Sequence, residues 1–221
     1  MDLFGKRLLV LGAFGQCGAA IVKLVLRNFH PSQIVLCSLS EQEARAVTKE
    51  AMGWAQCFQP GEKIELIPEW GNMLLTDQLT RLRGQLCTDP AVEAEYADEM
   101  VRFIYREYNE FTPAEKQEMF LYRLLTQYKP HVLIDCVNTA TGLAYQDIFS
   151  LGKTYLRHKR EGENDVRNSV PFAERLLMSD ALPSLVRHIE ILRDGMAQAG
   201  TQLPADPTQT ETDDTPEDDS L

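Results

Sequence analysis

The sequence predicts an α/β protein with a doubly wound parallel sheet and a helical insertion between the third and fourth strands. Short apolar runs alternate with longer amphipathic stretches, which is the order of strand–helix–strand units. Such units join parallel strands through right-handed crossovers. The alternation is interrupted at about residues 76–128, because this helical stretch is longer than an ordinary connection between two strands.

Turn and capping signals delimit the elements in the first part of the chain. The pair His30-Pro31 ends the first helix, and Ser40 with Glu43 three residues later forms a capping box that starts the second. The pattern therefore predicts strands over 6–11, 33–38 and 64–68, with helices over 17–29 and from about 40 to 57.

Longer helical patterns occupy the second part of the chain. Apolar residues recur at helical spacing over 90–108 and 112–128, and Thr112 followed by a proline starts the second of these helices. A fourth apolar strand begins after Pro130. The pattern then predicts helices over 142–160 and from about 171 to 200, the latter broken near Pro183.

A glycine-rich turn joins the first predicted strand to the first helix. Gly12 lets the chain reverse tightly, Gly15 lets the backbone approach a pyrophosphate group, and Gly18 lets the helix lie close to the strand. The amides and the dipole at the start of the helix would then face phosphates. The strand before the turn and the helix after it favour this interpretation over a glycine-rich turn that binds nothing.

This turn, Gly-Ala-Phe-Gly-Gln-Cys-Gly at 12–18, resembles the GxxGxxG fingerprint of short-chain dehydrogenase/reductases, and in particular of their extended and atypical, epimerase/dehydratase-like branch. The segment 71–74 is similar to the family's Gly-Asp-Leu turn that holds the adenine, and 138–140 to its Asn-Asn-Ala-Gly turn under the nicotinamide ribose. The resemblance covers about residues 5–145 and implies a Rossmann-like fold. It implies cofactor contacts from Gly12, Phe14, Gly15, Gln16, Gly18, Ser38, Asn72, Met73, Asn138, Thr139 and Ala140.

The resemblance implies NAD or NADP as the cofactor. In members that prefer NAD, an acidic residue about 20 positions after the glycines ends the second strand and holds the ribose hydroxyls. Ser38 stands at that place here, with Arg45 one helical turn further on. The sequence therefore leans toward NADP, whose 2′-phosphate would be accepted by Ser38, Ser40 or Arg45. Glu41 and Glu43 oppose this lean, and Ser40 is equally explained as a helix cap.

The family's catalytic Tyr-x-x-x-Lys pair is matched in spacing by Tyr155 and Lys159. In the family the tyrosine is the general acid or base, and the lysine lowers its pKa. The family carries this pair on the helix after the fifth strand, whereas Tyr155 follows the fourth strand, and no fifth strand is predicted near Gly200. The catalytic residues therefore stay unassigned.

Negative charge is concentrated at the end of the chain. The 221 residues carry a net charge of −11, and seven acidic residues but no basic one lie in 204–221. The other 26 acidic and 22 basic residues give −4, and they form no nucleic-acid footprint. We expect one domain over 1–203 and a disordered acidic tail over 204–221, with partner binding by the tail as the alternative.

Cysteine usage and hydropathy indicate the cellular compartment in which the protein is expected. The five cysteines have no metal-ligand spacing, and an odd number of them fits a reducing environment. No apolar stretch reaches the roughly 18 to 20 residues that span a bilayer, and the first residues are unlike a signal peptide. The sequence predicts a cytoplasmic protein without a metal, with Cys17, Cys37 and Cys136 as small apolar residues in or beside the core.

Other candidate residues can be explained either by ligand binding or by an ordinary structural role. His188 lies in an apolar-periodic stretch and is expected to be a surface or core residue rather than a ligand. A basic cluster over 153–160 would hold a phosphate or complement the C-terminus of a helix. Aromatic residues at 103–105 and 120–122 would form the core of the insertion or a lid over the cofactor.

These observations predict an NAD(P)-binding protein similar to short-chain reductases, with hydride transfer on an unknown carbonyl, alcohol or sugar-like substrate. The alternative is a catalytically silent NAD(P)-binding or protein-interaction module, such as a truncated reductase without its catalytic half. Whether the protein is an enzyme is therefore left open. Analogy with the family suggests a homodimer, and neither nucleic acid nor a membrane is expected as a partner.

Overall fold

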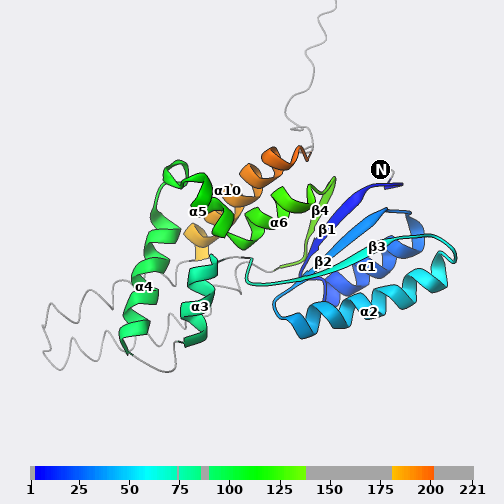
Figure 1. Cartoon of the computed structure of the whole chain (residues 1–221), viewed down its shortest axis with the longest axis horizontal. Coiled ribbons are helices and arrows are strands. Elements are labelled where there is room, and N and C mark those ends of the chain that lie inside the picture. The colour runs from blue at the N-terminus through cyan, green and yellow to red at the C-terminus, as the bar shows by residue number, and fades with distance from the viewer. Residues whose placement is uncertain (1–2, 74, 86–89, 138–180, 202–221) are drawn as a thin grey trace, which may run out of the picture.

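Four parallel strands form one sheet with helices on both faces (Figure 1). The computed structural model describes residues 3–73, 75–85, 90–137 and 181–201. The strands are β1 (Arg7–Leu11), β2 (Gln33–Ser38), β3 (Glu65–Trp70) and β4 (Val132–Asp135). Their order is β3-β2-β1-β4, so the chain winds outward from β1 in one direction and returns to place β4 on the other side. This arrangement is the Rossmann-like doubly wound parallel sheet that the sequence predicts.

The helices α1 (Gln16–Asn28) and α2 (Glu41–Phe58) cover one face of the sheet. Leu8 and Val10 of β1 point toward them, whereas Leu9 and Leu11 point into the core on the opposite face. All four side chains are buried. A strand that is covered on both faces has no polar positions, which explains why β1 is a continuous apolar run.

The capping box predicted at the start of α2 is confirmed. Ser40 Oγ accepts a hydrogen bond from the Glu43 amide at 3.4 Å, and the Glu43 carboxylate accepts one from the Ser40 amide at 3.3 Å. In α1 the buried stripe consists of Gly18, Val22, Val25 and Leu26. Cys17 lies on α1 outside that stripe and is exposed, so of the two places predicted for it, in or beside a core element, it takes the second.

Several helices lie between β3 and β4. They are α3 (Asp77–Gln85), α4 (Pro90–Tyr105), the 3-10 turn η1 (Tyr108–Glu110), α5 (Pro113–Glu118) and α6 (Phe120–Tyr128). Figure 1 shows α6 beside the sheet on the face opposite α1, with α3 and α4 beyond it. Buried residues of α3, α4 and α6 form one apolar cluster with this face of the sheet. The description of the segment as an insertion stays a prediction.

The helix predicted over 112–128 is in fact two helices, because the chain is extended at Met119. Met119 has φ −74° and ψ 114°, is almost completely buried, and pairs with Thr76 in an antiparallel bridge. The partner is distant in the sequence, so the helical pattern does not reveal the break. The helix predicted over 90–108 ends earlier, at Tyr105.

The last described helix, α10 (Ala181–Ala199), packs against α6 and α4. Gly195 makes the contact with α6 close, since a Cβ atom there would lie 2.6 Å from Leu125 Cδ1. Pro183 lies within α10 near its described start, and the break predicted there depends on residues before 181, which lie outside the described residues. The predicted helix over 142–160, Tyr155 and Lys159, the basic cluster and the tail over 204–221 lie outside the described residues.

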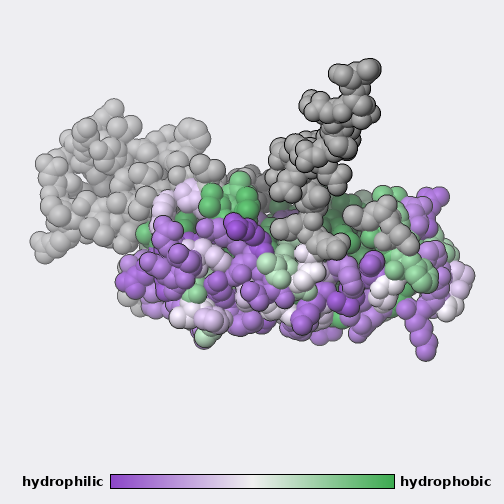
Figure 2. Space-filling view, turned by 90° about the horizontal axis from the view of Figure 1, so that it is seen from above, coloured by the Kyte–Doolittle hydropathy of each residue, from purple (hydrophilic) through white to green (hydrophobic). Residues whose placement is uncertain are grey.

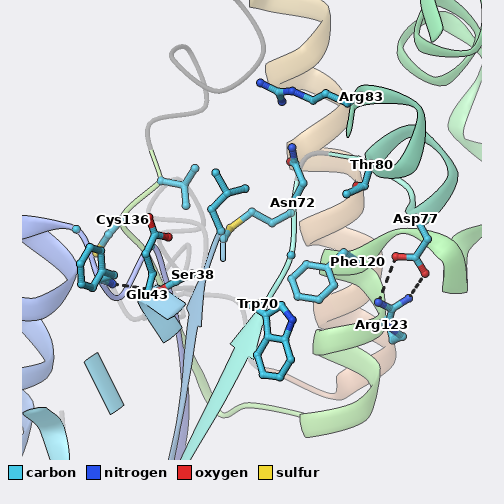
Figure 3. A pocket seen from close by; sticks show the side chains of 17 residues that line it. Ser38, Glu43, Trp70, Asn72, Asp77, Thr80, Arg83, Phe120, Arg123 and Cys136 are labelled. Atoms are coloured by element: carbon cyan, nitrogen blue, oxygen red, sulfur yellow. Dashed lines mark hydrogen bonds and ion pairs between the residues drawn. The ribbon is translucent and has the colours of Figure 1, made fainter. Parts of the chain in front are cut away.

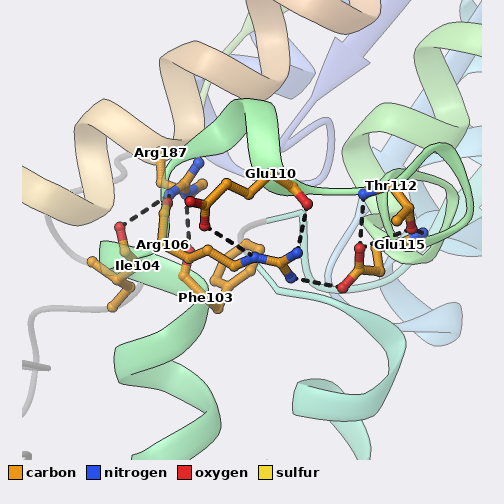
Figure 4. A network of polar contacts seen from close by, with 7 residues as sticks. All are labelled: Phe103, Ile104, Arg106, Glu110, Thr112, Glu115 and Arg187. Carbon is orange, nitrogen blue, oxygen red and sulfur yellow. Dashed lines mark hydrogen bonds and ion pairs between the residues drawn. The ribbon is translucent and has the colours of Figure 1, made fainter.

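A buried arginine joins α10 to the end of α4 (Figure 4). Arg187 donates hydrogen bonds from its guanidinium group to the carbonyls of Phe103 at 2.9 Å, Ile104 at 3.3 Å and Arg106. It thereby satisfies carbonyls that a helix leaves without partners at its C-terminus. Its charge is balanced by Glu190, 2.8 Å away. Burial lowers the pKa of Arg187, but an arginine remains protonated.

The surface is mostly hydrophilic on the face seen in Figure 2, and hydrophobic side chains form smaller patches there. Within the described ranges, no helix is long and apolar enough to cross a membrane. The large apolar residues that are exposed include Phe4 near the start of the chain, Leu24 of α1 and Met52 of α2.

Candidate functional site

The glycine turn between β1 and α1 has the geometry that close packing requires. Gly12 has φ +71°, a left-handed conformation that glycine adopts without strain. A Cβ atom on Gly18 would lie 2.2 Å from the Gly12 carbonyl oxygen and 2.8 Å from Ala13 Cα. Only a glycine at position 18 therefore lets α1 lie this close to the end of β1, which is the packing role predicted for it.

The N-terminus of α1 is not capped by a side chain. Gly15 is the N-cap residue, and the first turn of the helix holds no acidic residue. The amides of a first helical turn have no partner inside the helix, and they carry the positive end of its dipole. This is the arrangement in which helices bind anions.

A cavity of about 940 Å³ lies in front of this turn, at the carboxyl ends of the strands (Figure 3). Strands β2 and β4 lie on opposite sides of β1, and ligands of open α/β sheets bind at such a reversal of strand order. The predicted contact residues that line the cavity are Gly12, Phe14, Gly15, Ser38, Asn72 and Met73. Gln16 and Gly18 do not line it, and Asn138, Thr139 and Ala140 lie outside the described residues.

Ser38 holds two walls of the cavity together. Its side chain is buried, and its Oγ accepts a hydrogen bond from the Phe14 amide at 3.3 Å. Its carbonyl accepts another from the Gly71 amide, just after β3, at 3.1 Å. The serine thus fixes the glycine turn to the end of β3, in addition to facing the cavity.

Glu43 lines the cavity, whereas Arg45 does not. The Glu43 side chain lies beside Ser38 in Figure 3, at the end of β2. Arg45 forms an ion pair with Glu41 at 2.8 Å, and its guanidinium carbon lies 5.4 Å from the centre of the Trp70 ring. The charged group that lines the cavity at the end of β2 is therefore a carboxylate, while Arg83 of α3 and Arg123 of α6 line the cavity farther from β2.

Residues of α3 and α6 supply the opposite wall, of which the sequence indicated only the aromatic segment 120–122, as one alternative for that segment. Asp77 and Arg123 form an ion pair of 2.7 Å across α3 and α6, seen at the right of Figure 3. Phe120 packs on the backbone at Gly71, where a Cβ atom would lie 2.9 Å from the ring. The only sequence signal for this wall is the aromatic segment 120–122, since Phe120 both lines the cavity and belongs to the core.

The end of β4 forms the third wall. Cys136 and Val137 line the cavity beside Gly12. Burial, together with the negative charge of Asp135, raises the pKa of the Cys136 thiol. The thiol therefore stays protonated near neutral pH and supplies no nucleophilic thiolate to the cavity.

A histidine that the sequence left as a surface or core residue lies next to this wall. His188 of α10 is 3% exposed, so its place in the core is settled. Its Nε2 lies 3.0 Å from Asp135 Oδ2. Sequence spacing could not connect the two residues, because 52 positions separate them and the packing of α10 brings them together.

Neither a metal centre nor a similar protein helps to define the site. In the part of the chain that the structure describes, no group of three or more His, Cys, Asp or Glu residues is arranged to hold a metal ion. Comparisons with family models, curated proteins and solved structures found no match to the chain. The assignment of a function therefore depends on the motifs and the geometry of the site.

Proposed function

We propose that the protein binds a nicotinamide dinucleotide and is related in function to short-chain reductases. The observation that supports this most is the uncapped N-terminus of α1, which opens with its glycine turn onto a large cavity at the reversal of strand order. The pyrophosphate would bind at the amides of the turn over 12–18. A dinucleotide fits this combination of an anion site and an extended cavity, because it carries a pyrophosphate between two larger groups.

The two halves of the dinucleotide would lie on different strands. The adenosine half would extend toward Ser38, Glu43 and Asn72, past the ends of β2 and β3. The nicotinamide half would extend toward Cys136 and Val137, at the end of β4. The cofactor would supply the hydride chemistry, and the described residues would bind and orient it.

We infer that the cofactor is NAD rather than NADP, contrary to the lean of the sequence. The carboxylate of Glu43 in the cavity wall would accept hydrogen bonds from the ribose hydroxyls and repel a 2′-phosphate. Arg45, the cation that would favour the phosphate, is engaged by Glu41 and stacks over Trp70. Replacing Glu43 with glutamine should raise the affinity for NADPH relative to NADH.

The second candidate is a module that binds the cofactor without turnover. One observation favours it: Cys136 and Val137, the described residues that line the cavity at the end of β4, include no group suited to proton transfer. A panel of carbonyl substrates with bound NADH separates the two candidates. Consumption of NADH with any member supports a reductase, and its absence from a binding-competent protein supports the module.

Titration with NADH and NADPH tests the proposal. Trp70 lines the cavity and Trp54 does not, so a Trp54→Phe variant leaves one reporter tryptophan for fluorescence quenching. We expect saturable binding, tighter for NADH, that is lost in Gly15→Val because a side chain there would occupy the phosphate position. Gly53→Ala is the matched control, since it lies on α2 with nothing within 4 Å of its new Cβ atom. Absence of binding by the folded wild-type protein would refute the proposal.

A further inference from the structure

We propose that His188 is a positioning residue for the ligand half that lies over β4. His188 fixes the side chain of Asp135, and Asp135 in turn holds the backbone at the end of β4 in place. The inference rests on the proposed binding of a dinucleotide and adds to it a residue of α10, a helix that does not line the cavity.

The turn after β4 is held by one oxygen of Asp135. Its Oδ1 accepts a hydrogen bond from the Val137 amide at 2.8 Å. The Cys136 amide donates a hydrogen bond to the Leu11 carbonyl of β1 at 3.0 Å. Leu11 directly precedes the glycine turn, so this hydrogen bond connects the two turns. The carboxylate therefore decides the conformation in which Cys136 and Val137 face the cavity.

This turn is in close contact with the glycine turn between β1 and α1. A Cβ atom on Gly12 would lie 3.1 Å from the Cys136 carbonyl oxygen and 3.3 Å from Val137 Cγ2. A displacement of the turn by a few tenths of an ångström would consequently change the space above Gly12. The ends of β2 and β3, where the adenosine half would lie, are not part of this contact.

His188 holds the other oxygen of the same carboxylate. The distance from Nε2 to Asp135 Oδ2 is 3.0 Å, and the imidazole is 3% exposed. Because the carboxylate is an acceptor, Nε2 carries the proton, and a buried donor of this kind locks the rotamer of its partner. Nδ1 is buried and forms no hydrogen bond to the described residues, so the ring acts through Nε2 alone.

Polar contacts other than this pair also hold α10 against the rest of the protein. Arg187 binds the end of α4, and Asp194 forms a partly buried ion pair of 2.8 Å with Lys116 and accepts a hydrogen bond from the Tyr108 hydroxyl at 3.0 Å. Loss of the imidazole should therefore leave α10 in place and free only Asp135. This separates a positioning role from a purely structural one.

The test compares NADH with ADP-ribose, which lacks the nicotinamide, in three variants. His188→Leu removes the donor, His188→Gln retains an amide donor near the position of Nε2, and Asp194→Asn perturbs α10 away from the sheet. We expect about tenfold weaker binding of NADH in His188→Leu, the loss typical of one hydrogen bond to a charged group, with little change for ADP-ribose. His188→Gln should restore most of the affinity, and Asp194→Asn should leave both ligands unaffected.

Three results would overturn the inference. Equal losses for NADH and ADP-ribose in His188→Leu would indicate a general structural effect, and no loss for either would show that Asp135 needs no partner. A loss in Asp194→Asn equal to that in His188→Leu would assign the effect to α10 as a whole. If the wild-type protein bound neither ligand, the proposed function itself would fail, and this inference with it.

Discussion

The unit formed by β1, α1, β2 and α2 and the helical block formed by α3–α6 and α10 are built in different ways. The first unit follows local sequence signals: its strand β2 has the bounds predicted for it, and its capping box is the one predicted. The helical block depends on contacts between distant segments, such as the bridge between Thr76 and Met119 and the bonds of Arg187 to α4. The cavity lies where the two meet.

The difference shows in the polar groups that each region buries. Beside α1 and α2 the buried polar residues include the uncharged Thr48 and Gln59, whose side chains donate hydrogen bonds to backbone carbonyls. In the helical block, Arg187 and His188 are buried and an ion pair joins Lys116 to Asp194. Buried polar groups require matched partners, so this region is stable only when its tertiary contacts are complete.

The largest effect is expected from Gly18→Ala in the first unit. The new Cβ atom would lie 2.2 Å from a backbone carbonyl oxygen, which no side-chain rotation relieves. We expect a loss of more than about 3 kcal/mol in the free energy of unfolding, the upper end of overpacking effects. Gly53→Ala, on the exposed side of α2, should instead stabilise the protein by about 0.5 to 1 kcal/mol. Chemical denaturation measures both, and equal effects would contradict the packing role of Gly18.

Arg187→Met should give the next largest effect and tests the helical block. The carbonyls of Phe103 and Ile104 would lose their donor inside the protein. We expect a loss of about 2 to 3 kcal/mol in the free energy of unfolding. The control is Arg102→Met on α4, whose side chain is 67% exposed and forms only surface ion pairs, for which we expect less than about 0.5 kcal/mol. A small effect of both would mean that water replaces the guanidinium group.

Ser40→Ala and Thr112→Ala remove the same kind of cap in the two regions. Both residues complete capping boxes, with Glu43 in α2 and with Glu115 in α5. Each substitution should cost about 1 kcal/mol. If the two regions unfold together, both variants shift one denaturation transition. An earlier, separate transition in Thr112→Ala alone would show that the helical block unfolds independently.

The smallest effect concerns pH. Hydrogen bonds from Arg106 and Thr112 lower the pKa of Glu115 from 4.5 to about 2. Since the folded state holds the carboxylate in its charged form, this contribution to stability is complete above about pH 5 and is lost as the pH falls from 4.5 toward 2. The stability difference between wild type and Glu115→Gln should shrink over that interval. A difference that grows with acidification would contradict the sign.

Sequence patterns predicted those parts of the site that one segment makes by itself. The glycine turn and its helix depend on residues that are neighbours along the chain, so the roles of Gly12 in the tight reversal and of Gly18 in close packing were predictable. The wall made by Asp77, Phe120 and Arg123 was not, because it is brought to the cavity by the packing of α3 and α6. The sequence also does not tell which of Glu43 and Arg45 faces the cavity, and on this point the cofactor that we propose differs from the one that the sequence favours.

The sequence by itself determined the α/β class, the parallel sheet and the glycine turn between β1 and α1, because hydrophobic periodicity, caps and glycines act over a few residues. Only the tertiary structure decided that Met119 interrupts a helix, that His188 meets Asp135, and that Glu43 rather than Arg45 lines the cavity. Each of these depends on which surfaces of separate helices are buried together. That choice is made by the packing of the whole core.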